Sequence, residues 1–280
     1  MANTSLLYLW NDRTLYIGPV PERSRLSLGS ACLIVFLDAN ATVRLNGQRV
    51  SAQTFLVASG CPVEVEKHEG RAAVLLLDSL GYEYHALKGS MKSRCAEFGW
   101  HSMTEKAVVQ TFRTIARGNY GAKDLYHWML SLTRPEEYMK SSGYHHDERI
   151  EKAMVLIKNY GDTPMDILDC AQQVGLSVFE LEALFRKELG LSITGFRAWR
   201  LLGDTITYAA EGDKLAIASR KAGFRDEQQY LKVFSRHFGM HPRALSRYAP
   251  NTNIHIYKKP IASEEAKESL YSAPDFFEFV

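Results

Sequence analysis

Five side chains that commonly recognise other molecules lie close together in the stretch GFRDEQQYLKVFSRHFGMHP, residues 223–242. They are Arg225, Gln228, Gln229, Lys232 and Arg236. A glutamine amide can pair with the N6 and N7 edge of adenine, and a lysine can bind guanine or a phosphate. These residue types therefore predict contacts with the bases and phosphates of duplex DNA.

The apolar residues of the same stretch predict the helix that positions these side chains. On a helix beginning near Asp226, the inward-facing residues are expected to be Tyr230, Val233, Phe234 and His237 or Phe238. The outward-facing residues are then Gln228, Gln229, Lys232 and Ser235. A solvated surface helix is the alternative interpretation, but it leaves the flanking Gly, Phe and Pro pattern unexplained.

The stretch belongs to an internal duplication. Ala171, Gly175, Phe185 and Gly190 have counterparts 48 or 49 residues later in Ser219, Gly223, Phe234 and Gly239. Each copy reads as a helix ending at glycine, a short link and a second helix closed by glycine, which is typical of a helix-turn-helix. Ser177 and Asp226 are the expected N-caps of the second helices. Residues 192–210 predict a connecting helix of roughly 27 Å, which suits two recognition helices about one DNA turn apart.

The C-terminal part of the chain resembles the DNA-binding domain of the AraC/XylS family of bacterial transcription regulators. The resemblance is carried by GLSVFELEALFRKELGLS in the first copy and AGFRDEQQYLKVFSRHFGMHP in the second. It implies two helix-turn-helix units that bind successive major-groove segments, more often as an activator than as a repressor. Positions that read bases in relatives match Glu227, Gln228, Gln229, Leu231 and Lys232. Phosphate contacts are expected from Arg225, Arg236 and Arg243.

The first unit departs from this pattern. Its second helix carries Glu180 and Glu182 on the outward side, with Ala183 where relatives usually have Arg. Residues 147–190 contain five Lys/Arg against nine Asp/Glu, net −4, whereas residues 191–250 contain ten against five, net +5. Attraction to DNA is therefore expected mainly in the second unit. We favour weak DNA binding by the first unit, and the alternative is that Glu182 reads cytosine. The residues of the first unit that are expected to face DNA are Phe179, Arg186 and Lys187.

The connecting helix also departs from relatives at Gly203 and Asp204. Glycine inside a helix costs up to about 1 kcal/mol. Loose coupling between the two units is the expected consequence.

The N-terminal part of the chain alternates like antiparallel β-structure. Apolar runs such as residues 31–37 and 72–77 are separated by Gly, Pro, Asn and Ser, and Asn46-Gly47 predicts a tight hairpin. From Met103 the apolar spacing changes to three and four, which predicts two helices that cap the strands or pair with another subunit. The fold class is therefore expected to be α+β with two domains: an antiparallel β-barrel with trailing helices, then an all-α double helix-turn-helix.

Domain bounds follow from these patterns. We expect a sensor and dimerisation domain at 1–132 (barrel about 5–90, helices about 100–132), a linker at 133–146, the DNA-binding domain at 147–250 and a tail at 251–280. The family resemblance implies that the barrel is cupin-like and that it binds a small effector. The tail is expected either to fold back onto the barrel, to contact a partner or to fray.

Residues for catalysis or metal binding do not converge in the barrel region. His68 stands beside Glu64, Glu66 and Glu69, an arrangement typical of the solvated face of a strand rather than a metal site. The chain has no GxSxG, phosphate-binding or dinucleotide motif, so we expect no enzyme, no cofactor and no metal. The aromatic residues Tyr8, Trp10, Tyr16, Phe36 and Phe55 fit either a core or a pocket, and the ligand is unknown.

Composition places the protein among folded, non-membrane proteins. The 280 residues are 46% hydrophobic with net charge +2, no apolar run is long enough to span a bilayer, and the four scattered cysteines are expected to be reduced thiols. We expect a cytoplasmic, homodimeric, sequence-specific transcription regulator that binds promoter DNA and RNA polymerase under the control of an effector or a partner protein. The alternative is a regulator that acts mainly through protein–protein contacts.

Overall fold

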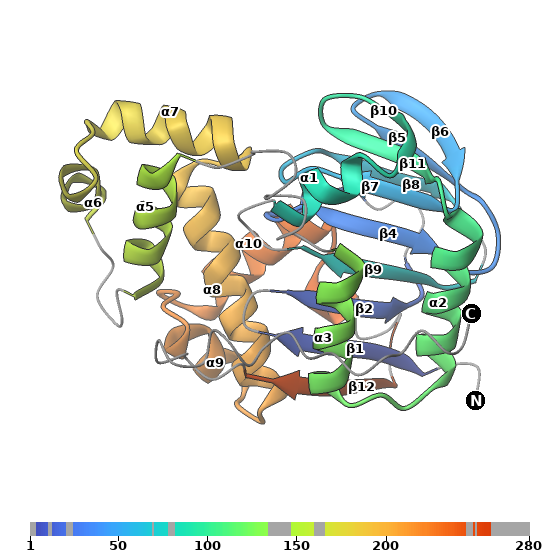
Figure 1. Ribbon diagram of the computed structural model, residues 1–280. Coiled ribbons are helices and arrows are strands. Elements are labelled where there is room, and N and C mark those ends of the chain that lie inside the picture. The colour runs from blue at the N-terminus through green and yellow to red at the C-terminus, as the bar shows by residue number, and fades with distance from the viewer. Residues whose placement is uncertain are drawn as a thin grey trace.

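The computed structural model describes residues 4–10, 13–20, 25–68, 70–77, 82–133, 147–159, 166–244, 249 and 251–258. A strand-rich N-terminal region packs beside a helical C-terminal region, which confirms the α+β class (Figure 1). Of the expected linker, residues 134–146 lie outside the described ranges. Among the described helices none is long and apolar enough to cross a membrane.

The described strands form two sheets rather than one closed barrel. The larger has the order β10-β11-β7-β4-β9-β2-β1-β12, and the smaller has the order β3-β8-β5-β6. Strands of the larger sheet are β1 (Ser5–Trp10), β2 (Thr14–Gly18), β4 (Cys32–Phe36), β7 (Thr54–Val57), β9 (Ala72–Leu76), β10 (Met91–Arg94), β11 (Phe98–Ser102) and β12 (Thr252–Tyr257). Strands of the smaller sheet are β3 (Arg25–Leu26), β5 (Ala41–Leu45), β6 (Gln48–Ala52) and β8 (Val63–Lys67). The prediction of a closed barrel is therefore wrong. The edge strands of the larger sheet, β10 and β12, do not pair with the smaller sheet in the described ranges.

The larger sheet is buried on both faces, which explains its continuous apolar strands. In β4, Leu33 and Val35 join the core beneath the helices, while Ile34 and Phe36 join the core between the two sheets. A strand with two buried faces needs apolar residues at successive positions. The run ACLIVFL is therefore a central strand and not a membrane segment.

The hairpin between β5 and β6 is confirmed. Leu45 pairs with Gln48, and the two turn residues between them, Asn46 and Gly47, have φ of 44° and 83°. Positive φ at both positions is what a type I′ turn requires, and Asn and Gly tolerate it.

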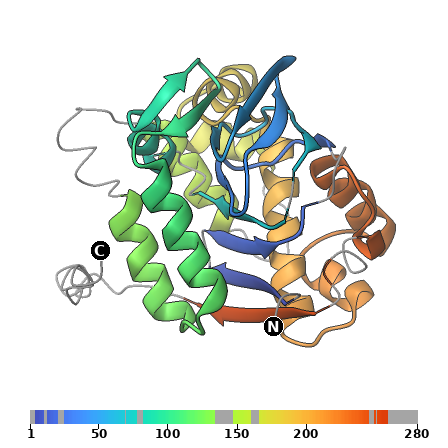
Figure 2. The same ribbon diagram turned by 90° about the vertical axis from the view of Figure 1, so that its right-hand side faces the viewer.

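Three helices lie against the outer face of the larger sheet: α1 (Tyr82–Lys88), α2 (Glu105–Arg117) and α3 (Ala122–Thr133). Val109, Phe112 and Met129 are at most 3% exposed and share a core with the strands. Figure 2 shows α2 and α3 side by side along this face. The expectation that α2 and α3 cap the strands is confirmed, and α1 lies within residues 5–90, the range predicted for the barrel.

The C-terminal region contains the helices α5 (Glu148–Asn159), α6 (Ile167–Gln173), α7 (Val178–Leu189), α8 (Ile193–Ala210), α9 (Leu215–Lys221) and α10 (Glu227–Phe238). The duplication is confirmed because α6–α7 and α9–α10 correspond. Gly175 and Gly223 turn between the helices with φ of 72° and 106°, and Phe185 and Phe234 are buried in separate cores. Helix α8 has 18 residues and continues through Gly203.

Strand β12 brings the chain back to the N-terminal sheet after the second helix-turn-helix. It pairs with β1 in parallel, with Ser5 opposite Thr252 and Trp10 opposite Tyr257. The rings of Tyr8 and His255 stack at 4.5 Å between centroids, and Lys258 forms an ion pair with Glu211. The expectation that the tail folds back is confirmed for residues 252–257, and residues 259–280 lie outside the described ranges.

Candidate nucleic-acid interface

Helix α10 is bounded by local signals at both ends. At its start, the Asp226 carboxylate accepts a hydrogen bond from the Gln229 backbone N–H at 2.8 Å. Hydrogen bonds from Arg225, and then from the Gln229 backbone, lower the pKa of this carboxyl. The helix ends at Gly239, whose φ of 63° is the left-handed conformation that glycine adopts without strain. These ends fix which residues share each face of the helix.

The apolar face of α10 is anchored in the second core. Tyr230 and Phe234 are each 3% exposed and pack with Phe224 and Leu202. Burial raises the pKa of Tyr230 to about 12. The predicted anchor residues are confirmed, with His237 buried and Val233 and Phe238 partly buried.

The opposite face of α10 is open to solvent. Gln228, Lys232 and Arg236 are exposed at intervals of four residues, so they line successive turns of one stripe. Glu227 and Leu231 are half-buried at its flank. Arg243 is exposed beyond the end of the helix. Of the residues predicted to contact DNA from the second unit, Gln228, Lys232 and Arg236 therefore share one accessible stripe.

Two of the predicted residues have local partners at the start of α10. The Gln229 side-chain oxygen accepts a hydrogen bond from the Arg225 backbone N–H at 2.9 Å. The Arg225 guanidinium bonds Asp226 at 2.9 Å while its side chain remains 83% exposed. Gln229 therefore organises the turn that leads into the helix, a role that its residue type did not indicate.

Two acidic residues of the first unit, Glu180 and Glu182, have structural roles at helix ends. Glu180 forms a capping box with Ser177, and hydrogen bonds from Ser177, its backbone N–H first, lower the pKa of the Glu180 carboxyl. Glu182 accepts a hydrogen bond from the Ile193 backbone N–H at 3.1 Å and another from Arg186 at 3.0 Å. Glu182 thus joins α7 to the start of α8, which disfavours the cytosine-reading alternative.

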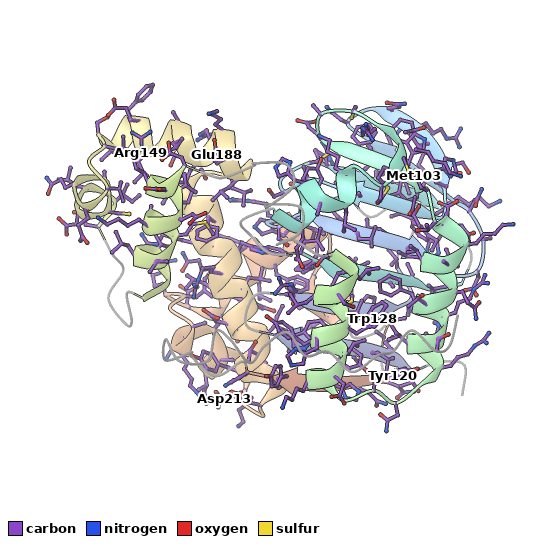
Figure 3. All side chains as sticks on the ribbon, viewed as in Figure 1. Met103, Tyr120, Trp128, Arg149, Glu188 and Asp213 are labelled. Atoms are coloured by element: carbon purple, nitrogen blue, oxygen red, sulfur yellow. The ribbon has the colours of Figure 1, made fainter. Side chains whose placement is uncertain are left out.

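The other predicted residues of the first unit are accessible. Phe179 is 82% exposed at the start of α7. Arg186 and Lys187 are exposed in its last turn, where Lys187 pairs with Glu188 at 3.3 Å. Figure 3 shows Glu188 over the first unit, well away from Asp213 beside the second. The two predicted sets therefore lie on separate units, joined through α8.

A contact that the sequence patterns did not predict joins α10 to the smaller sheet. The Ser27 backbone N–H donates to the His237 carbonyl at 2.8 Å, and the His237 Nδ1–H donates to the Ser27 carbonyl at 2.6 Å. The Trp199 ring of α8 packs against His237 and lies over Gly29, where an added Cβ would overlap it. We refer to Ser27, Gly29, Trp199 and His237 as the clasp. Burial lowers the pKa of His237.

Polar groups elsewhere do not assemble into a metal site within the described part of the chain. The His68 ring bonds the Val20 carbonyl and packs beside Phe36, while Glu69 lies outside the described residues. Glu66 is paired with Arg44 and Arg49 on the smaller sheet. Burial raises the pKa of Cys32 and Cys61 to about 12 and about 11, so both are protonated thiols near neutral pH.

Comparisons with known proteins agree with this geometry. Residues 170–248 match the family model of a helix-turn-helix domain. The chain is similar to two arabinose operon regulatory proteins. The protein of Escherichia coli is 30% identical over 40% of this chain and 39% of the relative. The protein of Salmonella typhimurium is 31% identical over 34% of this chain and 35% of the relative. The chain therefore matches well under half the length of these relatives.

Two solved structures of ToxT from Vibrio cholerae share the fold over most of the chain. An apo variant has a TM-score of 0.58 at 11% identity and covers 85% of this chain and 98% of ToxT. A form bound to an unsaturated fatty acid has a TM-score of 0.58 at 10% identity and covers 90% and 99%. Residues 170–248 are therefore identified as a helix-turn-helix domain, within a chain whose fold is similar to that of ToxT.

Proposed function

We propose that this protein is a sequence-specific DNA-binding transcription regulator in which α10 reads bases in the major groove. The observation that carries the proposal is the exposed stripe of Gln228, Lys232 and Arg236 opposite the buried Tyr230 and Phe234. A helix with this division can enter a groove about 12 Å wide while its apolar face stays in the protein.

Separate roles follow from the position of each side chain. Gln228 and Lys232 face the base edges, and Arg225, Arg236 and Arg243 hold phosphates on either side. Phe179, Arg186 and Lys187 contact the backbone from the first unit. The net charge of +5 over residues 191–250 supports placing most of the affinity in the second unit.

The test is selection of DNA fragments by the purified full-length chain, followed by footprinting and titration of the recovered sites. We expect a protected site with two segments about one helical turn apart. Specific binding should exceed non-specific binding by a factor on the order of 1,000 or more. Equal affinity for the selected site and for shuffled DNA would refute the proposal.

Control through the N-terminal region is a further part of the proposal. A ToxT structure of the same fold holds an unsaturated fatty acid, which supports a small effector for this chain. The clasp offers a direct connection, because it joins the smaller sheet to α8 and α10. We propose an activator that acts as a homodimer and contacts RNA polymerase.

A second candidate is a regulator that reaches promoters mainly through a partner protein. It is favoured by the exposed apolar side chains Leu168, Val178 and Phe179 on the first unit, at 51%, 39% and 82% exposure. The fragment selection separates the two candidates, since the partner-dependent protein would recover specific sites only when cell extract is added.

A further inference from the structure

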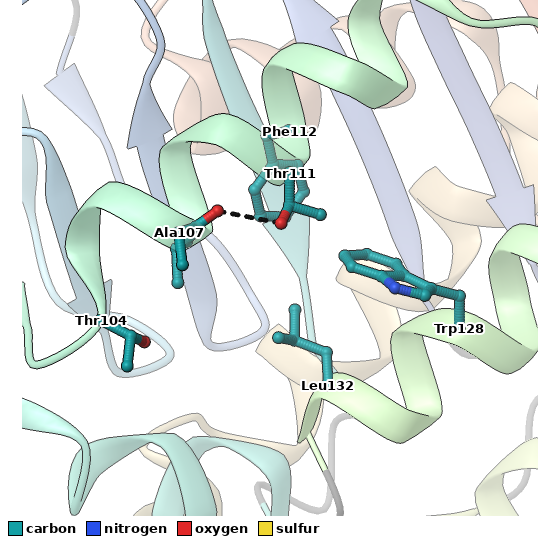
Figure 4. Close-up of a pocket in the computed structure, with 7 residues that line it drawn as sticks. Thr104, Ala107, Thr111, Phe112, Trp128 and Leu132 are labelled. Carbon is teal, nitrogen blue, oxygen red and sulfur yellow. Dashed lines mark hydrogen bonds between the residues drawn. The ribbon is translucent and has the colours of Figure 1, made fainter. Parts of the chain in front are cut away.

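An apolar groove runs between α2 and α3. Its volume is about 200 Å³, and its walls include Val108 and Phe112 from α2 and Trp128 and Leu132 from α3. Figure 4 shows Phe112 of α2 facing Trp128 and Leu132 of α3. The rings of Phe112 and Trp128 are nearly perpendicular, with 6.2 Å between centroids.

The size of the groove suits side chains better than a whole ligand. Small-molecule sites usually measure roughly 300–1,000 Å³. Val108, Trp128 and Leu132 remain half-buried, and Figure 3 shows Trp128 on the outer face of the region. An aromatic side chain from a peptide segment would complete the burial that the helices leave unfinished.

Strand β12 delivers the rest of the chain to this place. Tyr257 lies opposite Trp10, whose indole N–H donates to the Ala122 carbonyl at 2.8 Å. The Tyr257 and Tyr126 rings are 5.8 Å apart. The chain therefore leaves β12 beside the first turn of α3. Trp128 and Leu132 lie only about 9 and about 15 Å further along that helix, at 1.5 Å per residue.

The following segment has the length and the chemistry to fill the groove. Residues 259–275 can span up to about 56 Å, far more than the distance along α3. They lead to the apolar cluster of Phe276, Phe277, Phe279 and Val280. Residues 259–280 carry five acidic residues against Lys259 and Lys267, net −3, whereas α2 carries Lys106, Arg113 and Arg117 against Glu105, net +2.

We propose that residues 275–280 dock into the groove of their own chain, with phenylalanine rings against Trp128 and Leu132, above the buried Phe112. A tether of this length gives an effective concentration in the millimolar range. A second copy of the chain, or a free partner with similar intrinsic affinity, competes poorly at micromolar concentration. The docked segment thus covers a surface that would otherwise be open to other proteins.

The test is photo-crosslinking in the full-length protein with Phe277 replaced by benzoylphenylalanine, using a mixture of isotopically light and heavy chains. We expect crosslinks to α2 and α3, with both peptides carrying the same label. Mixed-label crosslinks would assign the groove to a second copy and overturn the proposal. Crosslinks elsewhere, or none to α2 and α3, would overturn it as well.

A matched pair of variants checks the groove itself. Val108→Arg should abolish the crosslink, whereas Gln110→Arg adds the same charge on another side of α2 and should retain it. Phe277→Ser leaves every described residue unchanged, so it should raise amide exchange in α2 and α3 without altering the sheet. Unchanged exchange in Phe277→Ser would count against the proposal even if Val108→Arg failed to fold.

Discussion

At the scale of single residues, Gln228 and Gln229 are chemically identical neighbours with different surroundings. Gln229 uses its side-chain oxygen on the Arg225 backbone, whereas the Gln228 side chain is exposed on the stripe. Gln229 is part of the turn that orients α10, and Gln228 is the residue that we propose contacts DNA. Their substitutions should therefore have different signatures.

Gln228→Ala should lose roughly 1–3 kcal/mol of binding free energy on the preferred site and relax the preference at one base pair. Gln229→Ala should instead destabilise the start of α10 by about 1 kcal/mol and weaken binding to all sequences alike. Titration of each variant against a panel of single-base changes, with amide exchange at α10, distinguishes them. Identical profiles for the two variants would contradict these roles.

Arg236→Ala should reduce the salt dependence of DNA binding. Loss of one phosphate contact lowers the slope of log affinity against log salt by about 1, and the change should be the same for specific and non-specific DNA. Binding measured at several salt concentrations gives the slope. Lys92→Ala removes an exposed charge from β10 and is the control, expected to leave the slope unchanged.

At the scale of elements, each helix-turn-helix depends on helix caps as well as on its buried apolar residues. In the first unit the Ser177 side chain accepts a hydrogen bond from the Glu180 backbone N–H, and the Glu180 carboxylate accepts one from the Ser177 backbone N–H. Glu182 then holds the start of α8. The carboxylates therefore stabilise the unit that positions Phe179, whatever charge they present to DNA.

Ser177→Ala should destabilise α7 by about 1 kcal/mol through loss of the N-cap. The pKa of Glu180 is lower in the folded than in the unfolded state. The carboxylate therefore stabilises the folded state above its unfolded pKa, and this stabilisation is lost as pH falls through the lowered folded pKa. The difference between wild type and variant should therefore shrink below about pH 4.3. Amide exchange at α7 measures it, with Ser131→Ala in α3 as a control; an unchanged α7 would contradict the capping role.

At the scale of the whole molecule, the clasp and β12 hold the C-terminal region to the N-terminal region at two separated places. Ser27 and His237 are 210 residues apart and exchange two hydrogen bonds. Strand β12 adds an edge to the larger sheet, and Lys258 pairs with Glu211 just after α8. The exposed stripe of α10 remains accessible while the end of the same helix is docked.

Docking at the clasp should weaken on acidification. The pKa of His237 is lowered by burial, so the undocked state binds more protons. Docking has no protonation cost above the undocked His237 pKa of about 6.5. The cost grows as pH falls from there toward the lowered pKa of docked His237. The protection factor of the Ser27 amide should fall over this range, and His237→Gln should remove the pH dependence. His241→Gln, an exposed neighbour, should retain it; a pH-independent wild type would refute the assignment.

Several local features could be predicted from the residue pattern. They are the paired helices, their Ser177 and Asp226 caps, the closing glycines and the division of α10 into buried and exposed faces. Each depends on residues within a few turns of one another, so periodicity and capping chemistry reveal it. Burial on both faces of β4 was also implied by its unbroken apolar run.

Contacts between distant elements could not be predicted in this way. The open pair of sheets, the parallel docking of β12, the bond from Glu182 to Ile193 and the clasp all join surfaces through residues that local patterns treat separately. Glu182 looked like a repulsive surface charge because the helix start that it caps is eleven residues away. These contacts form when complete elements pack against one another. Several surfaces of the chain have similar composition, so the sequence pattern does not show which of them will be in contact.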